Sequence, residues 1–118
     1  MLNVKGMLTP GTAIRYLTLA DNATVKASAT AAQVVNTSFA ASGKIDIDAS
    51  DITSQQLAAA TDGIPVLTVP FAYDPSGATW KVVGASATNA RYRWVADAGD
   101  TTKTLRLFKP TGLIMIFR

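Results

Sequence analysis

Three aspartates within six residues form the carboxylate cluster of the sequence, in Asp46-Ile47-Asp48-Ala49-Ser50-Asp51. Carboxylate oxygens are ligands that Ca²⁺ prefers, but an EF-hand loop needs acids at positions 1, 3 and 5, a glycine at 6 and a glutamate at 12. Here the acids stand at positions 1, 3 and 6, without that glycine or glutamate. We therefore interpret Asp46 and Asp48 as the solvent-facing side of a strand, and Asp51 as a favourable charge at a helix start. The sequence predicts no metal site and no cofactor.

Few residues of this chain could support enzymatic chemistry. The chain has no cysteine and no histidine, and all eight acidic residues are aspartate. These absences exclude disulfides, thiolate or imidazole metal sites, and nucleophiles that need a histidine base. Asp46 and Asp48 would serve a glycosidase only if one carboxyl had a raised pKa, and their neighbours do not indicate it. We predict that the protein is not an enzyme and has no catalytic residue.

The segment Arg91-Tyr92-Arg93-Trp94 alternates cations with aromatic rings, a combination that holds single-stranded nucleic acid in many proteins. On a strand, however, the two arginines fall on one face and the two rings on the other. Burying a large ring removes about 150–250 Å² from water, so we expect the rings to face the core. Arg91 and Arg93 are predicted to lie at the surface and contact an acidic protein partner, and we predict no nucleic-acid binding.

The charge and hydropathy of the chain fit this expectation. The net charge is +3, and the basic residues are scattered from Lys5 to Arg118 without a run, as in ordinary soluble domains. No apolar stretch approaches the roughly 18 residues of a membrane helix, and the first residues show no secretory signal. We expect synthesis in the cytoplasm and no membrane partner.

Both ends of the chain are candidates for partner contacts. Residues 1–11 form a possible N-terminal arm that ends in the break Pro10-Gly11. Such an arm either completes the sheet of its own domain or lies along the edge of a neighbour. Leu113–Phe117 is apolar on both faces, which predicts a central core strand or a subunit interface. Besides the two arginines, the residues predicted to contact a partner are Met1, Leu2, Val4, Lys5, Met7 and Leu8.

The elements that must position these residues are mostly strands, because the hydrophobic pattern has a period of two. Lys44–Asp48 alternates isoleucine with charged residues, as a half-buried strand does. Turn residues such as Asp74-Pro75-Ser76-Gly77 separate the segments. Further strands are expected at Asn3–Leu8, Ala13–Leu19, Thr24–Ala29, Gln33–Phe39, Val66–Tyr73, Thr79–Val83, Arg91–Val95 and Lys103–Lys109. The 118 residues thus predict a single all-β domain, an antiparallel β-sandwich or jelly roll, or a small barrel.

One short helix is expected near residues 51–61, where Ser50 or Asp51 can cap the start and Gly63 follows the end. The side chains predicted to point into the core are Ile14, Tyr16, Ile45, Ile47, Val66, Val69, Trp94, Leu105, Leu107 and Met115.

The composition and style of the whole chain resemble a family of viral proteins. The chain is rich in alanine and threonine, begins MLNVKGMLTPGTA directly into a predicted strand, and carries the turn Asp74-Pro75-Ser76-Gly77. In these respects it is similar to the head decoration, or cement, proteins of tailed phages. The resemblance implies a virion structural protein on the outside of the capsid. It also implies that many copies, as homodimers or homotrimers, clamp neighbouring major capsid protein subunits.

Two other functions agree with the same sequence. One is another virion component: a head fibre base, a tail or baseplate component, or a head–tail adaptor. The other is a carbohydrate-binding or ligand-binding β-sandwich, in which Trp80 and Trp94 would form an exposed stacking platform.

Overall fold

The computed structural model describes residues 2–4, 6–84 and 90–109. Within them the chain forms ten strands, one α-helix and one turn of 3₁₀ helix. The strands are β1 (Leu2–Val4), β2 (Met7–Leu8), β3 (Ile14–Leu19), β4 (Ala23–Lys26), β5 (Gln33–Ala41), β6 (Gly43–Asp48), β7 (Ile64–Pro70), β8 (Ala78–Val83), β9 (Arg91–Ala96) and β10 (Thr102–Phe108). The helices are α1 (Ser54–Ala59) and η1 (Pro75–Gly77), and no helix in the described ranges is long and apolar enough to span a membrane.

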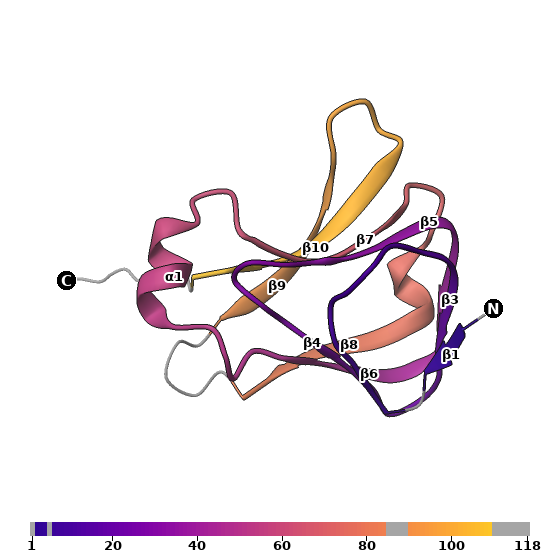
Figure 1. Cartoon of the computed structure of the whole chain (residues 1–118), viewed down its shortest axis with the longest axis horizontal. Helices are drawn as coiled ribbons and strands as arrows, with labels where there is room; N and C mark the ends of the chain where they lie inside the picture. The colour runs from indigo at the N-terminus through magenta and orange to yellow at the C-terminus, as the bar shows by residue number, and fades with distance from the viewer. Residues whose placement is uncertain (1, 5, 85–89, 110–118) are drawn as a thin grey trace.

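Successive strands from β1 to β8 alternate between two sheets (Figure 1). Of these eight strands, the odd-numbered ones belong to a six-stranded sheet with the order β1-β3-β5-β7-β10-β9, and the even-numbered ones form a four-stranded sheet with the order β2-β4-β6-β8. Every pairing among these eight strands is parallel. The chain therefore winds as four coils, each with one strand in either sheet, and α1 lies in the loop between the third and fourth coils.

The prediction of an all-β chain with two sheets and one short helix is confirmed, but antiparallel pairing throughout is wrong, and the sheets do not close into a barrel. Asp21-Asn22 is a turn, as expected, and Ser42-Gly43 is the junction of β5 and β6, but each leads from one sheet to the other instead of reversing the chain within a sheet. In the described residues, antiparallel pairing is confined to β10 with its two neighbours, β7 and β9.

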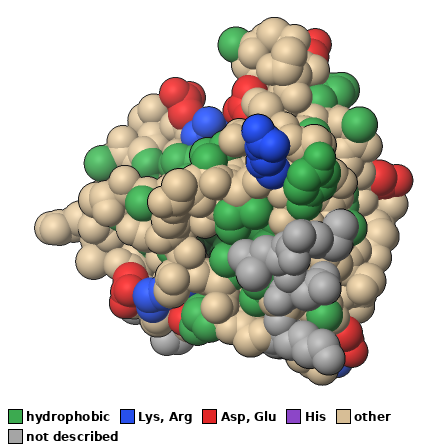
Figure 2. Space-filling view, turned by 45° about the vertical axis from the view of Figure 1, so that its right-hand side comes forward, with side chains coloured by type: hydrophobic (Ala, Val, Ile, Leu, Met, Phe, Trp, Pro, Cys, Tyr) green, Lys and Arg blue, Asp and Glu red, His purple; other side chains and the backbone are tan. Residues whose placement is uncertain are grey.

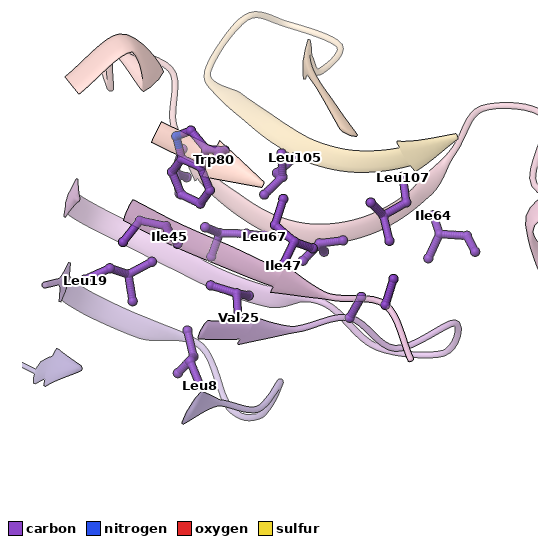
Figure 3. Packing of buried hydrophobic residues seen from close by; sticks show 14 of the residues in the cluster. Leu8, Leu19, Val25, Ile45, Ile47, Ile64, Leu67, Trp80, Leu105 and Leu107 are labelled. Carbon is purple, nitrogen blue, oxygen red and sulfur yellow. The ribbon is translucent and has the colours of Figure 1, made fainter. Parts of the chain in front are cut away.

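The hydrophobic core fills the space between the two sheets (Figure 3). Most predicted core residues are buried there: Ile45, Ile47, Val66, Val69, Leu105 and Leu107. Ile14 and Trp94 are half-buried against the same cluster, and Met115 lies outside the described residues. The prediction was wrong for Tyr16, which is 44% exposed.

An irregularity in the pairing of β3 with β5 accompanies the exposure of Tyr16. Ile14 pairs with Val35 and Tyr16 pairs with Ser38, so β5 has one more residue than β3 between these two pairs, as in a β-bulge. The shift lets Ile14 and Leu17 both pack on the core although they are three residues apart. Tyr16 is left on the outer face, because the two-residue alternation is broken before it.

The helix α1 has its N-cap two or three residues later than the predicted cap positions, Asp51 and Ser50. Its N-cap is Thr53, whose Oγ1 accepts a bond from the Gln56 backbone N–H at 3.1 Å, while the Gln56 side chain accepts one from the Thr53 N–H at 2.9 Å. This reciprocal pair is a capping box. Ser50 and Asp51 do not cap the helix, because the chain continues without helical structure through Ile52, which is buried.

Candidate interaction surface

The hairpin of β9 and β10 forms one end of the six-stranded sheet. Its closing loop projects beyond the two sheets, at the top of Figure 1. Gly99 and Asp100 in this loop have positive φ angles of 87° and 54°, which the sharp reversal after β9 requires. Among the described residues, β9 pairs with β10 on one side and with no strand on the other.

Two arginines face each other on the outer side of this hairpin, Arg93 on β9 and Arg106 on β10. Arg106 has an acidic partner, since its Nη2 lies 3.7 Å from Asp97 Oδ1. The other oxygen of Asp97 accepts bonds from the hydroxyls of Thr102 and Thr104, at 2.7 and 2.8 Å. Asp97 thus offsets the charge of Arg106, and both of its carboxylate oxygens are engaged in contacts within the hairpin.

Arg93 is held in another way. Its guanidinium carbon lies 4.3 Å from the centre of the Phe108 ring, a cation–π distance. Arg91, Tyr92 and Lys109 join these two residues around an open hollow of about 230 Å³. No carboxylate of the described chain lies within salt-bridge distance of Arg91, Arg93 or Lys109. We call these five residues the basic–aromatic surface.

The prediction that Arg91 and Arg93 lie at the surface is confirmed. The prediction that Tyr92 is buried was wrong, since it is 40% exposed. The reason is that the facing sheet has only four strands, so it does not fully cover the last strand of a six-stranded sheet. Trp94 is covered because its ring packs edge-on against Trp80 of β8, with ring centroids 5.3 Å apart.

The two tryptophans do not form an exposed stacking platform. Trp80 is 7% exposed and Trp94 is half-buried, in one aromatic cluster with Phe39 and Tyr73. Trp80 Nε1 donates to the carbonyl of Pro75 at 3.2 Å. Burial raises the pKa of Tyr73 to about 12. The cluster therefore stabilises the core. The prediction that Trp80 and Trp94 form an exposed carbohydrate-binding platform is wrong.

The N-terminal segment is the first coil of the fold. β1 pairs with β3, and β2 pairs with β4. Val4 is half-buried against the core and Leu8 is buried in it, whereas Met7 is 52% exposed. Of the two alternatives for this arm, the structure favours completion of the chain's own sheets. A partner contact through Met7 or the backbone of Leu2 stays a prediction, and Met1, Lys5 and Leu113–Phe117 lie outside the described residues.

Two of the three aspartates of the carboxylate cluster, Asp48 and Asp51, make local contacts. Lys26 Nζ lies 3.0 Å from Asp51 and 3.9 Å from Asp48, so it joins β4 to the loop after β6. The Ser50 backbone N–H donates to Asp48 Oδ1 at 2.9 Å, and this bond lowers the pKa of Asp48. Across the described part of the chain, no group of three or more acidic residues is placed to hold a metal ion.

Large hydrophobic side chains are exposed at four places in the described residues: Met7, Tyr16, Phe71 and Tyr92. Figure 2 shows one face on which hydrophobic side chains gather near the centre, with charged side chains around them. Of these four exposed side chains, Tyr92 lies on β9. In the described residues this strand leaves one edge unpaired and carries two arginines without acidic partners, and the strands and loops of the other three do not combine these features. The basic–aromatic surface is therefore the strongest candidate for a partner contact.

No protein-family model, curated protein or solved structure matches the chain.

Proposed function

We propose that this chain is a non-enzymatic structural protein of a virus particle. As a capsid decoration protein, it binds the outside of a phage head and stabilises contacts between major capsid subunits. The resemblance in composition and style to head decoration proteins motivates this proposal. Such a protein works by surface complementarity, so it needs a rigid body and an exposed surface able to recognise a partner.

Among the described residues, β9 has one unpaired edge and carries two arginines without an acidic partner, and this observation carries the proposal. The strand is held by β10 on one side, and Arg93 is ordered by Phe108 before any partner arrives. A preordered charged group loses less conformational entropy on binding. Arg91 and Arg93 can meet acidic groups of the capsid protein and thereby set the encounter rate and the register. Modest affinity per copy suffices where oligomers engage several subunits at once.

Electron microscopy of the particles that co-purify with the chain tests this function. We expect density for the chain at every equivalent position of the outer capsid surface, with β9 nearest the shell. Co-purification with no particle would overturn the proposal. Sedimentation of the purified chain tests the homodimer or homotrimer that the resemblance implies.

The coiled architecture also suits another virion component, the base of a fibre. Its parallel strands stack coil upon coil, and β1 and β2 are the outermost strands at the first coil. A further coil of similar shape could stack there, as in other solenoid proteins. The same micrographs distinguish the two functions, because a fibre base occupies isolated positions and projects outward.

A further inference from the structure

We propose that the edge of β9 that no described strand pairs with binds an extended acidic segment of a partner protein, which adds to the six-stranded sheet as a further strand. The partner segment carries carboxylates at alternate positions, on the face that meets Arg91 and Arg93. This inference rests on the proposed function, because it identifies the chemistry of the capsid segment that the chain recognises.

The backbone of β9 is set for such an addition. The Asp97 N–H donates to the Thr102 carbonyl at 3.0 Å, so these two residues are a hydrogen-bonded pair. Hydrogen-bonded pairs alternate with non-bonded pairs along an antiparallel ladder. The alternate residues of β9 therefore direct their N–H and C=O groups away from β10, and these residues are Tyr92, Trp94 and Ala96. An added strand could form backbone hydrogen bonds with these N–H and C=O groups, which lie in a row along the edge.

The charges on this edge determine which strand fits. Arg91 and Arg93 project from the outer face, and no described carboxylate lies within salt-bridge distance of them. Arginine on an edge strand disfavours pairing with basic or apolar edges, since its charge would lose water without compensation. Carboxylates two residues apart on an added strand would lie opposite the two arginines. The exposed ring of Tyr92 favours an apolar residue between them.

A second copy of this chain is a poorer occupant. In antiparallel pairing of two β9 strands, a register centred on Tyr92 or Arg93 brings the arginines of the two copies together. Like charges across a ladder are destabilising. Registers shifted toward the hairpin loop would set an arginine near Asp97, which already accepts bonds from Thr102 and Thr104 and lies 3.7 Å from Arg106.

A fluorescein-labelled peptide of alternating aspartate and valine tests the proposal by fluorescence anisotropy with the full chain. We expect saturable binding that weakens as salt is added. Binding should fall about tenfold or more for Arg91→Ser/Arg93→Ser. The matched variant Lys44→Ser/Lys81→Ser removes the same charge from the other sheet and should bind like the wild type. Equal losses of peptide affinity in the two variants would show that the peptide responds only to the net charge of the chain, and would overturn the proposal.

Peptide controls separate strand addition from simple charge attraction. A peptide of the same composition with its aspartates grouped at one end should bind about tenfold more weakly, because it cannot meet both arginines. Methylating the valine nitrogens blocks an antiparallel strand, and methylating the aspartate nitrogens blocks a parallel one. One methylated peptide should lose binding and the other retain it. Equal affinity of the two would overturn strand addition.

The outcomes distinguish this inference from the function on which it rests. Density over the whole capsid without peptide binding would leave the decoration function standing and overturn the edge site. Peptide binding without co-purification of any particle would leave the edge site standing and overturn the decoration function. Dimers that dissociate on Arg91→Ser/Arg93→Ser substitution would assign the edge to a second copy and overturn the acidic partner.

Discussion

The guanidinium carbon of Arg93 lies 4.3 Å from the centre of the Phe108 ring, diagonally across the β9–β10 ladder. Arg93 is directly opposite Arg106, and two cations in that position repel each other. The ring offers Arg93 a favourable position, while Arg106 turns to Asp97. The contact between Arg93 and Phe108 therefore helps two basic residues, Arg93 and Arg106, to occupy directly opposite positions on β9 and β10.

A double-mutant cycle measures this relationship. We expect a favourable coupling of about 0.5–1 kcal/mol between Arg93 and Phe108, from urea unfolding of the wild type, Arg93→Ala, Phe108→Leu and the double variant. Leucine keeps apolar bulk but removes the face of the ring. The same cycle between Arg93 and the exposed Tyr16 should give no coupling. A zero result for Phe108 would show that the ring does not hold the arginine.

The core between the sheets should respond strongly to truncation. Leu107 is fully buried among residues from both sheets, so Leu107→Ala should lower the free energy of unfolding by about 2–5 kcal/mol. Gln55→Ala, on the exposed side of α1, should change it by less than about 0.5 kcal/mol. Chemical denaturation measures both, and similar small effects would contradict the assignment of Leu107 to the core.

The capping box predicts a graded effect at the start of α1. Thr53→Ala removes the oxygen that accepts the Gln56 N–H and should cost about 0.5–2 kcal/mol. Thr53→Ser keeps that oxygen and should retain most of the stability. Thermal unfolding followed by circular dichroism compares the two variants. Equal melting temperatures for serine and alanine would mean that the cap contributes nothing.

Local patterns in the sequence predicted where strands form but not how they pair. The alternation in Lys44–Asp48 placed Ile45 and Ile47 in the core correctly, because a half-buried strand has the same pattern in parallel and antiparallel sheets. The boundary between two strands at Ser42-Gly43 was correctly located as well. Whether a turn reverses the chain within a sheet or crosses to another sheet depends on contacts between distant residues, which no short segment encodes.

The coiled winding left no repeat to detect. Leu2 pairs with Leu17, and Leu17 pairs with Phe39, so successive coils differ in length and no fixed period appears. The surface arginines Arg91 and Arg93 were predictable from alternation alone. The unpaired edge beside them was not, because it depends on β9 being the last strand of its sheet among the described residues.

The last prediction concerns alkaline pH and the hydroxyl of Tyr73. Burial raises its pKa from 10.0 to about 12, because the phenolate is poorly solvated in the aromatic cluster. The unfolded chain releases this proton near its ordinary pKa, while the folded chain keeps it. Between about pH 10 and 12 the unfolded state therefore binds fewer protons, and stability falls as pH rises through this window. Below it the contribution is fully present.

Tyr73→Phe removes this titration, so its free energy of unfolding should decline less than that of the wild type across the window. The hydroxyl has no hydrogen-bond partner within the described part of the chain, so at neutral pH the variant should be within about 1 kcal/mol of the wild type. Tyr16→Phe, at an exposed tyrosine, should follow the wild type. Urea unfolding between about pH 9 and 12 measures the three proteins, and parallel declines of all three would show that Tyr73 is not the group responsible.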